Sequence, residues 1–170
     1  MLAVDYDEPG GPEVLKLKKI NMPDISKDEV LIKVKSAGVN RPDIIQREGN
    51  YPAPPGHSKT LGLEVSGIIE KVGTNVKKFL VGDKVAALVN GGGYAEFCKA
   101  NESLVFHIPK NITFNEAACI PECFFTAWSN IVMRGEIKKN QKILIHGGTS
   151  GVGIASIQIA KLFDSYIITT

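Results

Sequence analysis

The chain has 170 residues, 44% of them hydrophobic and 22% charged, and its formal net charge at pH 7 is +2. This is the composition of an ordinary soluble globular protein, and so small a charge argues against nucleic acid or an anionic membrane as the main partner. No apolar run approaches the roughly 20 residues needed to span a bilayer, and the N-terminus has no signal-peptide pattern, so we expect a cytoplasmic protein with no membrane partner. The cysteines number three, which favours free thiols in a reducing compartment over a disulfide framework.

The first hundred residues are rich in strand patterns separated by glycine and proline. Apolar and polar side chains alternate in several short segments, which predicts strands with one buried face. These segments cover residues 14–18, 29–36, 63–72, 82–89 and 94–99. Residues 42–48 form the one early helical pattern. Strands at such short spacing, with turns between them, predict a compact β-barrel.

Helical patterns replace the strand patterns after about residue 110. Thr113 and Glu116 have the spacing of a capping box, in which two side chains satisfy the first N–H groups of a helix. We therefore divide the chain into a first domain of residues 1–118 and a second of residues 119–170. The predicted helices near this boundary cover residues 117–120 and 123–133, with an interruption at Pro121.

A glycine-rich turn follows a short apolar strand near the end of the chain. The strand covers residues 142–146, and the turn, residues 147–153, reads Gly-Gly-Thr-Ser-Gly-Val-Gly; a helix (154–163) and a second strand (166–170) come next. This order opens a dinucleotide-binding βαβ unit, in which glycines let the backbone approach a pyrophosphate at a helix N-terminus. The residues that we expect to bind the cofactor here are Gly148, Ser150, Gly151, Val152 and Gly153.

Ser150 departs from the general fingerprint, which has a glycine at its position. A serine is small enough to be tolerated there, and its hydroxyl would be available to the cofactor or the substrate. A glycine motif can also be no more than a tight turn, but this one lies between a strand and a helix. The position that separates NAD from NADP falls about 20 residues beyond the glycines, just past residue 170.

Several further short motifs lie along the chain, and their order is informative. They are Pro9–Glu13, Val39–Asp43, Gly49–Pro52, Leu61–Gly67, Val81–Val85, Ala117–Glu122 and Thr126–Trp128, with the glycine-rich turn after them. In this order they resemble the medium-chain dehydrogenase/reductase superfamily, and within it the zinc-free quinone oxidoreductase branch. The placement of Ser150 before Gly151 is similar to the p53-inducible quinone reductase type.

The resemblance implies a mixed α/β fold, in which a GroES-like β-barrel domain precedes a Rossmann domain and the cofactor binds in the cleft between them. The chain would be the N-terminal half of such an enzyme: the barrel domain and the first βα unit of a truncated Rossmann domain. The segment that returns to complete the barrel would lie beyond it, and the full-length parent would be a homodimer. A parallel sheet left with two strands exposes an apolar edge and face, so we expect this chain to aggregate or to depend on a partner.

The resemblance also implies the reaction. We expect an NADPH-dependent quinone oxidoreductase that transfers a hydride to a small-molecule quinone or to a conjugated carbonyl such as an enone, and NADH stays open as the cofactor. Because the cofactor carries the reactivity, we predict no catalytic nucleophile, acid or base. The alternative is a catalytically silent truncated fragment, or a non-enzymatic crystallin-like or RNA-binding relative.

Three residues would lie beside the substrate by this resemblance: Asn40, Arg41 and Tyr51. Asn40 would also face the nicotinamide, so it belongs to the cofactor site as well. The plainer alternatives are a turn residue for Asn40 and a surface aromatic for Tyr51.

Two residues of the second domain would contact the cofactor, Thr126 and His146. Thr126 could equally be a packed core residue, and His146 could be a support behind the site. In the first domain, we expect Asp43 to cap the short helix that follows Pro42.

Zinc is not expected. In the zinc-dependent alcohol dehydrogenases of the superfamily, a Cys and a His at the barrel loops bind the metal. The corresponding places here hold Asn40 or Arg41, and Leu63 beside Glu64. No pair of these residues can build a tetrahedral site of nitrogen and sulfur ligands.

Two cysteines offer the other possible metal ligands. Cys119 and Cys123 lie four residues apart, on one face of a predicted helix, with no histidine near them in the sequence. We interpret them as two buried cysteines that pack like small apolar residues, rather than as a metal site.

Overall fold

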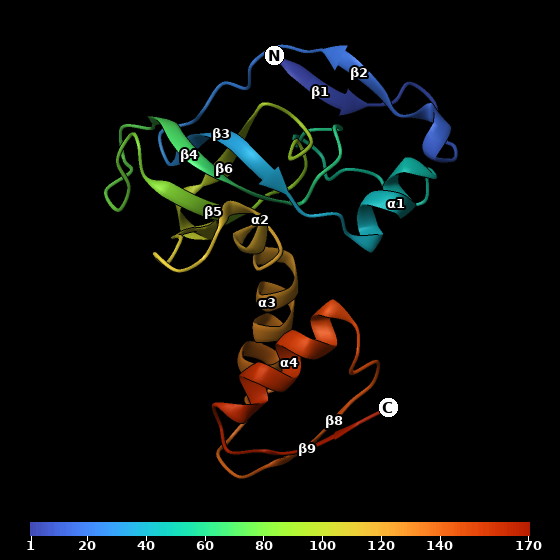
Figure 1. The fold of residues 1–170 in the computed structure, drawn as a ribbon, viewed down its shortest axis with the longest axis vertical. Coiled ribbons are helices and arrows are strands. Elements are labelled where there is room, and N and C mark those ends of the chain that lie inside the picture. Colours follow the sequence, from blue (N-terminus) through green and yellow to red (C-terminus); the bar gives the residue numbers. More distant parts are fainter. The chain divides into compact units, whose positions relative to one another are not determined.

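The computed structural model describes all 170 residues, and they form two compact units, residues 1–121 and residues 122–170 (Figure 1). The first unit consists of antiparallel strands with short helices. The second contains helices and a two-stranded parallel sheet. None of the helices combines the length and the apolar character that crossing a bilayer requires.

A five-stranded antiparallel sheet forms the body of the first unit. Its strands lie in the order β6, β3, β4, β5, β7 and curl into half of a barrel (Figure 1). The strands are β3 (Glu29–Ala37), β4 (Glu64–Val72), β5 (Lys84–Leu88), β6 (Phe97–Asn101) and β7 (Val105–His107). The prediction of a compact barrel is therefore confirmed only in part, because β6 and β7 do not pair and the sheet stays open.

The pairing between the two longest strands is irregular. The register of β3 against β4 shifts between Leu31 and Ile32, and it shifts again before Ser36. Such bulges bend a strand and increase its twist, which suits a curled sheet. Gly67 of β4 lies close to β3 here, since a Cβ on it would collide with the carbonyl group of Lys33.

Apolar residues of these strands form the core of the first unit. Val30 and Ile32 of β3, Val65 and Ile69 of β4, and Val85 of β5 are at most 1% exposed. The alternating patterns of the sequence predict such buried faces, and the structure confirms them. The packed core fixes the strand ends from which the candidate site residues of this unit emerge.

A separate two-stranded ribbon lies beside the curled sheet (Figure 1). β1 (Leu2–Asp5) pairs antiparallel with β2 (Lys16–Lys19). β2 starts two residues later than the pattern predicts, because Pro12–Val14 form a 3₁₀ turn. An isolated bridge between Ala3 and Ala95 joins the ribbon to the segment that leads into β6.

The helices of the first unit are short. α1 covers Arg41–Arg47 and α2 covers Phe114–Ala117, and Glu102–Leu104 form a 3₁₀ turn. The predicted capping box is present: Thr113 Oγ1 accepts from the N–H of Glu116, and the Glu116 carboxylate accepts from the N–H of Thr113 at 2.8 Å. Because this box starts the helix at its first possible residue, the helix predicted to begin at residue 117 is placed too late.

The second unit contains a βαβ element. α3 (Pro121–Trp128) continues into a π-helical turn (Ser129–Arg134). β8 (Lys142–Ile145), α4 (Gly151–Lys161) and β9 (Tyr166–Thr169) follow. β8 and β9 pair in parallel, so the predicted order of strand, turn, helix and strand is confirmed.

Two helix boundaries differ from the predictions. The predicted interruption is present but lies at residues 118–120, and Pro121 itself begins α3, because the first turn of a helix does not need the N–H that proline lacks. α4 begins at Gly151, three residues before the predicted Ile154, because Ser150 caps it.

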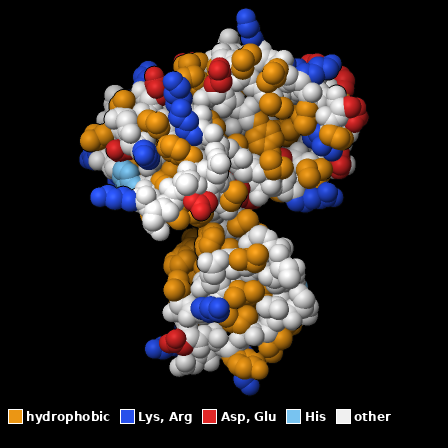
Figure 2. All heavy atoms as spheres, viewed as in Figure 1, with side chains coloured by type: hydrophobic (Ala, Val, Ile, Leu, Met, Phe, Trp, Pro, Cys, Tyr) orange, Lys and Arg blue, Asp and Glu red, His pale blue; other side chains and the backbone are white.

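The second unit has a small core and an exposed apolar face. Ala127 of α3 packs with Ala155 and Ile159 of α4. In the sheet, Leu144 and Ile168 lie opposite each other, and they are 54% and 48% exposed. Figure 2 shows apolar side chains at the surface of this unit.

Candidate nucleotide and substrate site

The turn between β8 and α4 closes only with glycine at three positions. Gly147 has a φ of +70°, which favours glycine. A Cβ on Gly153 would collide with the carbonyl oxygen of Gly147, and one on Gly148 would lie 2.7 Å from the Cβ of Thr169. The backbone therefore has side-chain-free surface at the start of α4.

Ser150 is the N-cap of α4. Its hydroxyl accepts from the N–H of Gly153 at 3.0 Å and donates to the carbonyl oxygen of Gly147 at 2.8 Å. The structure differs here from the expectation that this hydroxyl is available to the cofactor or substrate, because both hydrogen bonds lie within the turn. Serine can replace glycine at this position because its φ of −72° is open to any residue.

The start of α4 leaves donors for an anion. The N–H groups of Gly153 and Ile154 donate to Ser150, whereas those of Gly151 and Val152 have no partner within the protein. The 11-residue helix adds the positive end of its dipole. These donors, beside the closely packed glycines of the turn, fit the pyrophosphate of a dinucleotide.

His146 and Thr170 flank the same turn. They follow β8 and β9, and Nδ1 of His146 lies 3.1 Å from Oγ1 of Thr170. Because the two strands are parallel, these residues share the carboxyl edge of the sheet, where open α/β sheets bind nucleotides. Thr126 lies in α3, is half-buried, and accepts at its carbonyl oxygen from the side chain of Asn130, so its alternative as a packed residue stays open.

In the first unit, the side chain of Asn40 forms a hydrogen bond with a buried carboxylate. Asn40 precedes α1, and its Nδ2 donates to Oε1 of Glu64 at 2.8 Å. Glu64 is the first residue of β4 and is 2% exposed. No group of three or more His, Cys, Asp or Glu side chains is arranged to hold a metal ion.

Asp43 joins three segments of the first unit. Its Oδ2 accepts from the N–H of Asn40 and from the hydroxyl of Tyr94, both at 2.9 Å, and its Oδ1 accepts from the N–H of Gly62 at 3.0 Å. The side chain is buried. Asp43 takes part in capping α1 as expected, but from the third helical position, because Asn40 is the N-cap.

Tyr94 and Glu64 belong to this network, and neither is among the site residues predicted from the sequence. The pattern predicts a strand from residue 94, but β6 begins at Phe97, and Tyr94 turns its hydroxyl to Asp43. Burial raises the pKa of Tyr94 well above its usual range, and the nearby carboxylates of Asp43 and Glu64 raise it further. A glutamate inside the apolar run 61–69 could have signalled this network, since a charge is rarely buried without a partner.

Tyr51 lies in a different hollow. This hollow has a volume of about 330 Å³ and is lined by Tyr6, Gln46, Tyr51 and the proline-rich segment that follows. Asn40 and Arg41 do not line it, and Arg41 is exposed. The structure therefore does not gather the three predicted substrate residues into one pocket.

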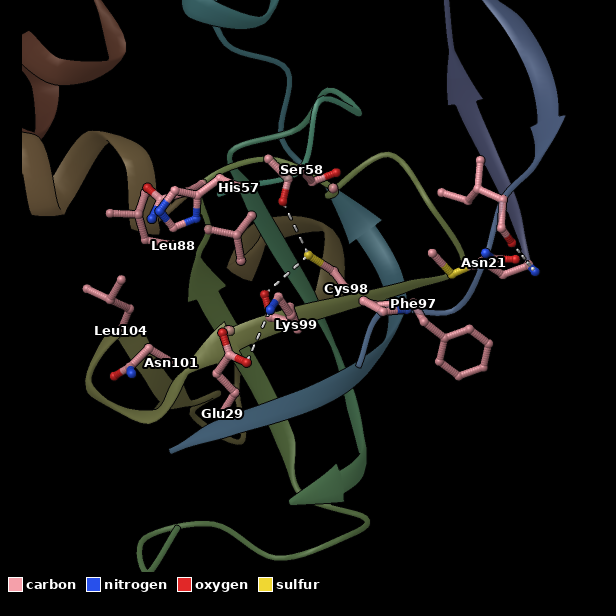
Figure 3. A pocket seen from close by; sticks show the side chains of 18 residues that line it. Asn21, Glu29, His57, Ser58, Leu88, Phe97, Cys98, Lys99, Asn101 and Leu104 are labelled. Atoms are coloured by element: carbon pink, nitrogen blue, oxygen red, sulfur yellow. Dashed lines mark hydrogen bonds and ion pairs between the residues drawn. The ribbon is translucent and has the colours of Figure 1, made fainter. Parts of the chain in front are cut away.

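A second cavity follows β6, with a volume of about 270 Å³ (Figure 3). All of β6 lines it, including the Lys99 side chain, which forms an ion pair with Glu29 at 3.3 Å. Burial raises the pKa of Cys98 to about 12, so this thiol is a poor nucleophile at neutral pH. None of the predicted site residues lines this cavity.

The three cysteines are free thiols that differ in exposure. Cys98 is buried, Cys123 is half-buried and Cys119 is exposed. The interpretation of Cys119 and Cys123 as two buried cysteines on one helix face is therefore wrong. The physical reason is the start of α3 at Pro121, which leaves Cys119 in the exposed link before the helix.

Comparisons with known proteins agree with this architecture. The family model described as the alcohol dehydrogenase GroES-like domain matches residues 26–110. The quinone oxidoreductase of Homo sapiens is 39% identical over 172 residues, an alignment that covers 100% of this chain and 52% of that protein. The chain thus spans about half the length of the curated relatives it matches.

Solved structures of similar sequence share the fold of this chain. A structure of CurK enoyl reductase superposes with a TM-score of 0.89 at 29% identity, covering 99% of this chain and 53% of that one. A mycobacterial protein solved in complex with NADPH superposes with a TM-score of 0.85 at 34% identity, covering 99% and 52%. The matched domain, the sequence identities and the shared fold agree. The chain belongs to the alcohol dehydrogenase GroES-like domain family, which is part of the medium-chain dehydrogenase/reductase superfamily.

Proposed function

We propose that the protein acts as an NADPH-dependent, zinc-independent quinone oxidoreductase in the cytoplasm. The observation that carries the proposal is the turn at residues 147–153, which requires glycine at positions 147, 148 and 153 and leaves two N–H groups without protein partners at the start of α4. The similarity to a quinone oxidoreductase and to a protein solved with NADPH supports it.

In this proposal, β8, α4 and β9 are the first elements of a Rossmann sheet. The N–H groups of Gly151 and Val152 bind the pyrophosphate, and Gly148 and Gly153 let the backbone approach it. His146 directly follows β8 at the carboxyl edge of the sheet, where it would contact the cofactor. When bound, the reduced nicotinamide supplies a hydride, so the protein has only to bind and orient the reactants.

The proposed acceptor is a small-molecule quinone or a conjugated enone. Asn40 would contact both nicotinamide and acceptor, with Arg41 and Tyr51 on the acceptor and Thr126 on the nicotinamide. Reduction of an enone is the second candidate reaction, and the similarity to CurK enoyl reductase favours it.

The proposal is tested by titrating the purified chain with NADPH and with NADH, using the fluorescence of the reduced nicotinamide. We expect saturable binding that is tighter for NADPH. Gly153→Ala should abolish binding, because its Cβ would collide with the carbonyl oxygen of Gly147. Ser150→Gly, which restores the general fingerprint, should keep it. A folded wild-type chain that binds neither nucleotide would contradict the proposal and favour the catalytically silent alternative.

A further inference from the structure

A charged side chain is buried beside the proposed nicotinamide residue. Glu64 is 2% exposed, and its Oε1 receives the hydrogen bond from Nδ2 of Asn40 at 2.8 Å. The carboxylate packs over Gly38, where a Cβ would collide with it and would also lie 2.7 Å from the carbonyl oxygen of Ala118. Burying a carboxylate is costly, and an apolar residue of similar volume would often be at least as stable. A role of Glu64 in orienting Asn40 would explain why a carboxylate occupies this buried position.

The chemistry of Glu64 fixes which way the amide of Asn40 faces. An ionised carboxylate can only accept hydrogen bonds, whereas an Asn amide has a donor end and an acceptor end. Asn40 must therefore turn its NH₂ group to Glu64. In the capping box of α1 the Asn40 side chain also accepts from the N–H of Asp43, and this leaves the second lone pair of Oδ1 for a ligand. The backbone of Asn40 is held as well, because its N–H donates to Asp43 at 2.9 Å. Both the position and the polarity of this amide are set by buried carboxylates.

We propose that Glu64 is a positioning residue for nucleotide binding. By accepting from Nδ2, it presents Oδ1 of Asn40 as a fixed acceptor for a hydrogen-bond donor of the bound nicotinamide riboside, either a ribose hydroxyl or the carboxamide NH₂. The inference rests on the proposed function, in which this residue contacts the nicotinamide half of NADPH. Without the carboxylate, the amide can turn either end to the ligand, and the preorganised acceptor is lost.

The test combines Glu64→Gln with a variant that restores the polarity. The glutamine introduced by Glu64→Gln can donate or accept, so it no longer dictates the orientation of Asn40. We expect NADPH affinity to fall about fivefold to tenfold, the scale of one hydrogen bond. The melting temperature should stay the same or rise, because a buried charge has been removed. In Asn40→Asp/Glu64→Gln, the side chain at position 40 is acceptor-only, and the new glutamine amide donates to it. This double variant should bind NADPH within about twofold of the wild type.

A control on the same strand is Glu70→Gln, because Glu70 is exposed, and it should change neither affinity nor melting temperature. Wild-type affinity in Glu64→Gln would overturn the inference. So would a loss of affinity that follows the melting temperature through all variants, or a double variant that binds as weakly as Glu64→Gln. If the folded wild type binds no NADPH, the proposed function itself fails; if it binds and the variants do not separate, only this inference fails.

The source of the donor is separated with a second ligand. The reduced 3-acetylpyridine analogue of NADPH has no carboxamide NH₂ but keeps the ribose hydroxyls. If Glu64→Gln weakens the analogue as much as NADPH, the hydroxyl is the donor. If the analogue is unaffected by the substitution while NADPH is weakened, the carboxamide is the donor.

Discussion

The sulfur atom of Cys123 fills the space in front of Gly151: a Cβ on Gly151 would lie only 2.7 Å from Sγ of Cys123. Cys123 belongs to α3, and Gly151 is the first residue of α4. The half-buried thiol therefore packs against the turn proposed to hold the pyrophosphate. A larger side chain at position 151 therefore requires a smaller one at position 123.

Gly151→Ala tests this contact. Alanine is normally the better helix residue by about 1 kcal/mol, but here we expect a loss of about 1–3 kcal/mol in the free energy of unfolding, because the methyl group overpacks against Sγ. Urea denaturation measures the change. Gly151→Ala/Cys123→Ala is the matched control, in which the smaller residue at 123 should recover most of the stability. A single variant as stable as the wild type would contradict the close contact.

The Asp43 network gives a second prediction. Asp43→Asn keeps the shape of the side chain but replaces one of the two acceptor oxygens by an NH₂ group. That NH₂ group then faces at least one of the three groups that donate to Asp43 in the wild type. We expect a loss of about 3 kcal/mol in the free energy of unfolding. Tyr94→Phe removes only one of the three hydrogen bonds and should cost about 1 kcal/mol. Equal losses in the two variants, measured by urea denaturation, would show that the carboxylate does not act as a shared acceptor.

The range of an interaction along the chain explains which features could be predicted. β3 and the capping box of Thr113 and Glu116 depend on patterns a few residues long, and both are confirmed. The hydrogen bond between Tyr94 and Asp43 joins residues 51 positions apart, and no local pattern contains it. The same limit applies to Glu64 and Asn40, whose pairing depends on how β4 and the segment before α1 meet in space.

The errors at the cysteines have the same origin. Spacing alone placed Cys119 and Cys123 on one helix, but proline started the helix between them. Whether each cysteine is exposed depends on tertiary packing, which cannot be inferred from a spacing of four residues. Candidate cofactor residues of the glycine turn were easier to identify because strand, turn and helix are adjacent in the sequence.

Cys98 predicts a distinct pH dependence. Burial raises its pKa from 9.0 to about 12, so between these values the unfolded chain loses the thiol proton and the folded chain keeps it. The stabilising contribution is fully present below pH 9, and stability should fall by about 1.4 kcal/mol for each unit above it. We expect Cys98→Ala to flatten this part of a plot of unfolding free energy against pH. Exposed Cys119 is the control, and Cys119→Ala should leave the slope unchanged.

The apolar face of the second unit gives the fourth prediction. Ile168 is 48% exposed and lies opposite Leu144, whereas its neighbour Ile167 points to the other face of the sheet. Ile168→Thr keeps a β-branched side chain and should reduce aggregation, measured by light scattering, without lowering the melting temperature. Ile167→Thr is the matched control and should lower it, because Ile167 is more deeply packed. If Ile168→Thr aggregates as readily as the wild type, this face is not the cause.

The strand order of the first unit also sets when it can fold during synthesis. β3 is paired on one side with β4 and on the other with β6, which the ribosome makes roughly 60 residues later. At about 5–20 residues per second, one edge of β3 waits roughly 3–12 s for its neighbour. During that time the nascent chain carries a strand with one unpaired edge that chaperones or another chain can bind. The sheet is completed only when β7 has emerged, so folding of this unit is a late event in translation.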